Sequence, residues 1–138
     1  MDVNIITFCD SVHNYSGKLI IVGTLNTLAA ERFPTILSDV SFVTTLTFTS
    51  AETGHHVGHL RFSKKDNPNL ILIDVDMPID VKDPVIGDFA YVNLYGSLSG
   101  MPIAEPGTYV ATFSVEGMQR QIELNIVQAS EAAFEVVN

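Results

Sequence analysis

Three of the four histidines, His55, His56 and His59, lie within five residues of one another. Histidine is a frequent metal ligand, so the spacing needs to be tested against a metal site. The surrounding residues alternate as in a strand, where His55 and His59 would share a face about 13 Å apart. A zinc ion holds its ligands at about 2 Å, so it cannot reach both rings unless the strand bulges or another strand folds back. We expect solvated strand histidines and no metal.

A second group of possible ligands is acidic and lies near Pro78 and Pro84. Calcium takes several oxygen ligands gathered from a loop, and β-sandwich domains often bind it at one end. The spacing matches no known calcium loop, and a chain this acidic brings carboxylates together by chance. The sequence leaves a calcium site open at five aspartates: Asp74, Asp76, Asp80, Asp83 and Asp88.

Cys9, Asp10 and His13 are the one combination that could supply a thiol nucleophile and a base. No pattern that positions a nucleophile surrounds them. A single cysteine that ends an apolar run is typical of a small buried side chain. The glycines also fit neither phosphate-binding spacing. We expect no catalytic residue and no cofactor, and hence a protein that is not an enzyme.

An aromatic stripe is the main candidate for binding: Phe89, Tyr91, Asn93 and Tyr95 alternate with small and aliphatic residues. If the aliphatic residues fill the core, the aromatic rings face water, where they suit protein or sugar recognition. Two other interpretations stay open. The aromatic side chains could fill the core instead, or the strand could be covered on both sides, for example by residues 129–138.

The elements that must position these residues are strands. Alternation of apolar and polar residues predicts about eight of them and no helix of convincing length. They are expected at residues 2–9, 18–28, 39–49, 55–63, 70–81, 88–98, 109–115 and 118–127. This pattern predicts an all-β fold, an immunoglobulin-like antiparallel β-sandwich of about seven to nine strands.

Two stretches specify their strands most clearly. In residues 39–49 apolar side chains alternate with threonines, which predicts a strand that covers the core on one face. In the last hairpin, a two-residue loop at Glu116–Gly117 would place Val115 opposite Met118 and Tyr109 opposite Leu124. Turn and pattern then agree on one register.

The segments between the strands carry weaker expectations. Residues 10–17 are predicted to form a polar loop, and residues 29–38 have room for one helical turn at most. Gly23 marks a bulge or a close approach of two chains. Pro78 and Pro84 indicate an edge strand or a break. We expect one domain over residues 1–128, followed by a tail at 129–138.

Composition limits the partners. The chain has 138 residues, of which 46% are hydrophobic, and a net charge of −9. This suits one packed domain, and the acidic balance makes nucleic acid an unsuitable partner. No apolar stretch is long enough to span a membrane, and the N-terminus does not resemble a signal peptide. A single cysteine fits a reducing compartment, so we expect a cytoplasmic protein.

Two motifs carry resemblances. Pro106-Gly107-Thr108-Tyr109 is similar to the tyrosine corner of immunoglobulin-like sandwiches, although Ala111 stands where antibody domains have a cysteine and the chain lacks tryptophan. Phe8-Cys9-Asp10, Gly17-Lys18-Leu19, Val22-Gly23-Thr24 and Phe33-Pro34 together resemble a family of bacterial single-domain proteins of unknown function. That resemblance implies an immunoglobulin-like sandwich of bacterial or phage origin and transfers no functional residue.

The sequence therefore predicts a non-catalytic protein-interaction or assembly module that binds a partner protein or itself. The alternative is a small-ligand or carbohydrate-binding sandwich that uses the same aromatic side chains, Phe89, Tyr91 and Tyr95 with Asn93.

Overall fold

The structure is a computed structural model that describes residues 1–84 and 86–129, and this part of the chain is all-β. Its eight long strands match the eight expected from the sequence: β1 (Asp2–Tyr15), β2 (Lys18–Leu25), β5 (Ser41–Thr49), β6 (Gly54–Lys64), β7 (Asn67–Val81), β8 (Phe89–Ser97), β10 (Gly107–Val115) and β11 (Met118–Gln128). The remaining elements are short: β3 (Thr27–Ala30), β4 (Thr35–Ile36), β9 (Pro102–Ile103) and the 3₁₀ turn η1 (Ser50–Glu52).

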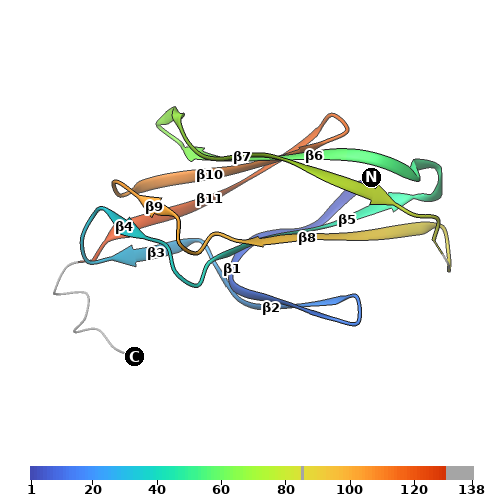
Figure 1. The fold of residues 1–138 in the computed structure, drawn as a ribbon, viewed down its shortest axis with the longest axis horizontal. Coiled ribbons are helices and arrows are strands. Elements are labelled where there is room, and N and C mark those ends of the chain that lie inside the picture. The colour runs from blue at the N-terminus through green and yellow to red at the C-terminus, as the bar shows by residue number, and fades with distance from the viewer. Residues whose placement is uncertain (85, 130–138) are drawn as a thin grey trace.

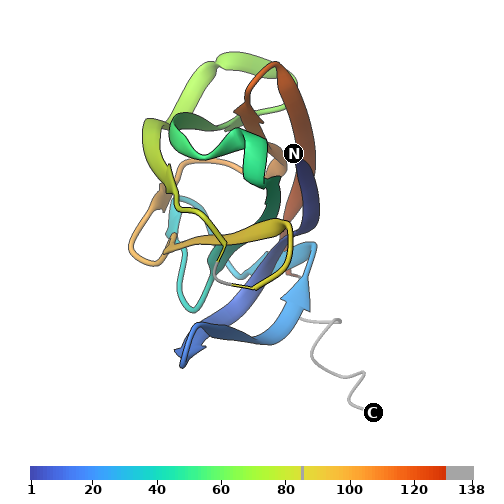
Figure 2. The same cartoon turned by 90° about the vertical axis from the view of Figure 1, so that its right-hand side faces the viewer.

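The long strands form two sheets that pack face to face as a sandwich. One sheet has four strands in the order β2-β1-β5-β8, and the other has five in the order β3-β11-β10-β6-β7. In Figure 1 strands β6, β7, β10 and β11 of the five-stranded sheet lie above β5 and β8 of the four-stranded one, and Figure 2 looks along the strands. All neighbours are antiparallel except β3 and β11, which run parallel.

The core lies between the two layers and is held by aromatic contacts across them. In β5, Phe42, Leu46 and Phe48 point inward as their alternation predicts. The Phe8 ring of β1 lies 6.1 Å from Phe42 in its own sheet and 5.8 Å from Phe62 in the other, measured between ring centroids. These ring contacts join the two sheets across the core.

The last hairpin has the predicted register. Val115 lies opposite Met118 and Tyr109 lies opposite Leu124 across the Glu116–Gly117 turn. Both turn residues have positive φ, 49° and 75°, as a two-residue hairpin loop requires. The buried Tyr109 hydroxyl donates a hydrogen bond of 2.7 Å to the carbonyl of Glu105, as the resemblance to a tyrosine corner predicts.

The predicted polar loop at residues 10–17 is wrong. β1 continues to Tyr15 and pairs with β2, so that residues 11–22 form a hairpin arm. Ser16 and Gly17, with φ of 50° and 80°, make its two-residue turn. Figure 1 shows the arm folded beneath the four-stranded sheet. Its polar residues concealed the strand because the arm has only partial contact with the core, so strict alternation is not required there.

Gly23 is a close-approach point and leaves the register unbroken. Cys9 pairs with Thr24 and Ser11 pairs with Val22, with no extra residue between them. Gly23 has a φ of 65°, and a Cβ there would lie 2.3 Å from the Asp10 carboxylate. Only glycine fits at this bend, which is where the arm leaves the plane of the sheet.

Three further expectations concern residues 29–38, the C-terminal tail and β7. The one helical turn for which residues 29–38 have room is not formed, because β3 and β4 occupy parts of this segment and its residues hold no helix. The expected tail at residues 129–138 lies outside the described residues except for Ala129. The tail's proposed covering role therefore stays a prediction. β7 is an edge strand, as Pro78 indicated.

Thr44 offers a test of the packing. Its side chain is fully buried in β5, and its hydroxyl has no hydrogen-bond partner among the described residues. Replacement by valine keeps the shape and removes an unsatisfied polar group, so Thr44→Val should raise the free energy of unfolding by about 1 kcal/mol. Urea denaturation measures this, with Thr45→Val on the outer face as a control expected to change stability little. A loss of stability in Thr44→Val would show that the hydroxyl is satisfied.

Candidate functional site

The aromatic stripe of β8 faces outward. Phe89, Tyr91 and Tyr95 are 50%, 73% and 45% exposed, whereas the alternate residues Val92 and Leu94 pack against the core. Of the interpretations that the sequence left open, the structure supports outward aromatic side chains and excludes their placement in the core. Exposed rings with a polar hydroxyl are suited to recognition, so this strand is the first candidate site.

The backbone of the same residues faces the open edge of the sheet. The amide of Leu98 donates to the carbonyl of Val40, and the amide of Ser50 donates to the carbonyl of Asp88. At both ends of the β5–β8 ladder, therefore, the hydrogen-bonded pairs consist of even-numbered residues. In an antiparallel pair the hydrogen-bonded residues alternate. Even-numbered residues of β8 therefore bond β5. The five odd-numbered ones, Phe89, Tyr91, Asn93, Tyr95 and Ser97, point their N–H and C=O groups away from it.

Among the described strands β8 ends its sheet and pairs with β5 alone. It is nine residues long and carries no charged side chain and no proline. Natural edge strands are usually protected against pairing with another chain by such residues or by bends. An edge without them is a template for strand addition.

The other long edges are protected. β7 carries Pro68 and Pro78, which cannot donate backbone hydrogen bonds, together with outward aspartates. β2 begins with Lys18 and bends at Gly23. β8 is therefore the least protected of the long edges in the described part of the chain.

The hairpin arm forms a groove beside this strand. A cavity of about 370 Å³ lies between the arm and the outer face of the sheet, with Ile5, Ile21 and Tyr91 among its lining. The side-chain amide of Asn93 donates to the carbonyl of Gly17 at 3.3 Å, which links the arm turn to the middle of β8. The sequence did not predict this groove, although the Ser16-Gly17 dipeptide is a turn signal that could have located the hairpin.

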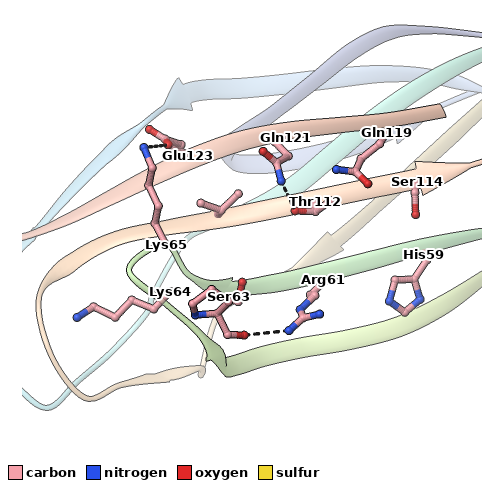
Figure 3. A pocket seen from close by; sticks show the side chains of 12 residues that line it. His59, Arg61, Ser63, Lys64, Lys65, Thr112, Ser114, Gln119, Gln121 and Glu123 are labelled. Atoms are coloured by element: carbon pink, nitrogen blue, oxygen red, sulfur yellow. Dashed lines mark hydrogen bonds and ion pairs between the residues drawn. The ribbon is translucent and has the colours of Figure 1, made fainter. Parts of the chain in front are cut away.

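A second hollow lies on the outer face of the five-stranded sheet and has a volume of about 460 Å³. Cross-strand rows of polar side chains line it, among them Arg61 with Thr112 and Gln121 (Figure 3). Gln121 donates to the Thr112 hydroxyl at 3.1 Å, and Arg61 donates to the Pro68 carbonyl at 2.9 Å. The described lining holds no phenylalanine, tyrosine or tryptophan, so it lacks the large ring face that suits a sugar. We interpret it as a solvated polar face.

The three neighbouring histidines each have their own carboxylate partner. His59 lies between Asp74 and Asp76, with nitrogen–oxygen distances of 2.6 and 2.7 Å. His56 pairs with Glu116, and its other nitrogen lies 2.6 Å from the Glu52 carbonyl. Because the two rings bond separate partners, they do not converge. No group of three histidine, cysteine or acidic side chains within residues 1–84 and 86–129 is placed to hold a metal.

These contacts raise the proton affinity of His56 and His59. The hydrogen bond to Asp76, together with the charges of Asp74 and Asp76, raises the pKa of His59 above its ordinary value. The hydrogen bonds to Glu116 and to the Glu52 backbone raise the pKa of His56. Each imidazolium is therefore stabilised in the folded state relative to the unfolded chain.

Within residues 1–84 and 86–129, neither the acidic cluster nor the thiol forms the site considered for it. Asp74, Asp76 and Asp80 lie along β7 beside histidines of β6 and are not gathered in a loop. Cys9 is fully buried, with its Sγ 3.8 Å from the carbonyl of Ser41.

Burial, and then the charge of Asp10, raises the pKa of Cys9, which keeps the thiol protonated and weakly nucleophilic. His13 lies on the exposed arm, where its Nε2 is 3.1 Å from the Ser11 hydroxyl.

Comparison with known proteins places the chain in a family. Residues 4–127 match the sequence model of a family of unknown function, DUF6941. No curated protein and no solved structure matches the chain. The described residues include no helix with the length and apolar character that crossing a membrane requires.

The histidine pairs predict a pH dependence. A pKa that is raised on folding adds stability below the unfolded value of about 6.5, and this contribution is lost as the pH rises through the folded-state value. The free energy of unfolding should therefore fall more steeply for the wild type than for His56→Gln/His59→Gln between about pH 6 and pH 8. Denaturant titrations at several pH values measure the difference.

His55→Gln is the control, because the His55 side chain is 90% exposed and lies 3.5 Å from Asp80. An exposed pair of this kind contributes little to stability, so this variant should follow the wild type. Equal slopes for the wild type and the double variant would contradict the assignment.

Proposed function

The chain belongs to the DUF6941 family of unknown function, and from its own geometry we propose that it is a non-catalytic assembly module that self-associates by strand addition at β8. One observation carries this proposal: the residues that expose aromatic side chains on the outer face of β8 also turn toward the open edge the backbone groups that no described strand bonds. An added strand would satisfy both at once, because it would bond the backbone and cover the rings.

The uncharged edge favours a second copy as the partner. Each chain carries a net charge of −9, so two copies repel each other least where they meet at a surface that is free of charge. β8 is such a surface, whereas β7 presents aspartates. A basic partner protein would be less suitable, because β8 itself has no carboxylate to pair with its positive charges.

The environments of the thiol and the histidines support a role without catalysis. The one thiol is buried and protonated, and the histidines are held by carboxylates that are not arranged as a nucleophile and base. The cysteine is free, which suits a reducing compartment, and the cytoplasm remains the expected location.

A small-ligand or carbohydrate-binding function is the second candidate. The groove between the arm and β8 favours it, because the aromatic side chain of Tyr91 lines it together with the polar side chains of Asn4 and Asn93. A sugar that binds there should raise the melting temperature in a glycan panel and leave the mass of the protein unchanged. Self-association should instead depend on protein concentration.

Solution mass tests self-association directly. Light scattering across a range of concentrations should show a wild-type dimer that dissociates on dilution. Tyr91→Ser/Tyr95→Ser should be a folded monomer, because it removes the ring area that an added strand would cover. Asn93→Pro should also be a folded monomer, since its lost N–H faces the open edge and not β5.

Tyr15→Ser is the matched control, because Tyr15 is 70% exposed but lies on the arm turn. It should keep the wild-type mass. A wild type that remains monomeric at the highest soluble concentration would contradict the proposal, as would a dimer that survives both β8 variants.

A further inference from the structure

We propose that two copies pair β8 with β8 in antiparallel register about a two-fold axis through Asn93, which would join their four-stranded sheets into one continuous sheet. This inference rests on the proposed self-association and names its geometry. It follows from the phase of the β8 backbone, the order of its side chains and the positions of charge around it.

The backbone phase restricts the possible registers. Only the odd-numbered residues of β8 direct their N–H and C=O groups to the open edge. Odd residues must therefore meet odd residues of the second copy, and a shift by one residue would oppose groups that cannot bond. An axis through Asn93, the middle of Phe89–Ser97, pairs the full length of the strand. An axis through Val92 would pair only Phe89 to Tyr95.

The side chains are self-complementary in this register. On the outer face Tyr91 lies opposite Tyr95 of the second copy, and the symmetry repeats this pair on the other side of the axis. Aromatic pairs directly across an antiparallel ladder stabilise it. On the inner face Val92 lies opposite Leu94 of the second copy. Both are only partly buried in the single chain, so pairing would complete their burial.

The five-stranded sheet also ends on the side of the molecule where β8 lies, with β7 as its edge strand. β7 and β8 contact each other at the margin of the sandwich, and Val75 of β7 is 45% exposed although it shares the inner face with buried residues. A second copy joined at β8 would bring its own β7 margin to this side. The interface would then cover apolar side chains from both layers.

Acidic charge is placed away from the axis. Asp88 is the acidic residue directly before β8, and in this register the two copies of Asp88 stand ten residues apart along the joined strands, about 33 Å. That distance is several times the screening length in physiological salt. The arrangement is closed, because both β8 edges are used, and so it gives a dimer and not a filament.

The cross-strand pair of Tyr91 and Tyr95 provides the test. In Tyr91→Lys/Tyr95→Glu the proposed register places opposite charges across the interface at both symmetric positions. In Tyr91→Lys/Tyr95→Lys it places like charges there. The second variant should dissociate about tenfold more readily than the first, measured by sedimentation or light scattering. The general charge effect works in the opposite direction, because the second variant has the smaller net negative charge.

Circular dichroism and melting of both variants confirm that they fold, and both carry changes only on the outer face. Wild-type protein mixed from differently isotope-labelled copies gives a second measurement by NMR. Contacts between the Hα atoms of Val92 and Leu94 from different copies are expected, since this would be a non-hydrogen-bonded pair.

The outcomes separate the two proposals. A wild-type monomer overturns both the assembly function and its register. A wild-type dimer that β8 variants disrupt, but whose two charge variants dissociate alike, keeps the function and overturns the axis at Asn93. Contacts between the Hα atoms of two Val92 residues would move the axis to Val92 and likewise overturn the proposed register.

Discussion

Two sheets that share one apolar layer require every central strand to send alternate residues inward, and this constraint governs the whole molecule. β5 meets it with Phe42, Leu46 and Phe48, and β10 meets it with Tyr109 and Phe113. Once these strands are fixed, the orientation of each neighbour follows from its register. β8 pairs with β5 residue by residue, so the burial of Val92 and Leu94 forces Tyr91 and Tyr95 outward.

The same pairing explains why the candidate site lies at an edge. A strand at the end of a sheet has half of its backbone groups without a strand partner, and the protein protects such edges unevenly. On β7 prolines and aspartates limit further pairing, and the aspartates also hold His59. On β8 no comparable feature is present, and the exposed aromatic side chains add apolar area. This contrast between two edges of one molecule is the physical basis for the proposed assembly.

Electrostatics divides the surface in a related way. The acidic residues of β7 face the histidines of β6 on the outer side of the five-stranded sheet, where each pair is local and partly solvated. Such pairs adjust stability with pH and do not form a reactive centre. The β8 strand is uncharged on a chain that is otherwise strongly acidic, which leaves one region where two like-charged copies can approach.

The sequence by itself determined the long strands and the last hairpin. Period-two alternation and the Glu116–Gly117 turn are local signals, and each strand that packs on the core must show them. Tertiary structure alone decided the rest. The arm at residues 11–22 was hidden because its two strands pair with each other and have only partial contact with the core, so its sequence needs no strict alternation. Which face of β8 is buried, and which strands are edges, depends on the order of strands in each sheet. That order is set by packing between residues far apart in the chain, such as Phe8 with Phe62, and no local pattern encodes it.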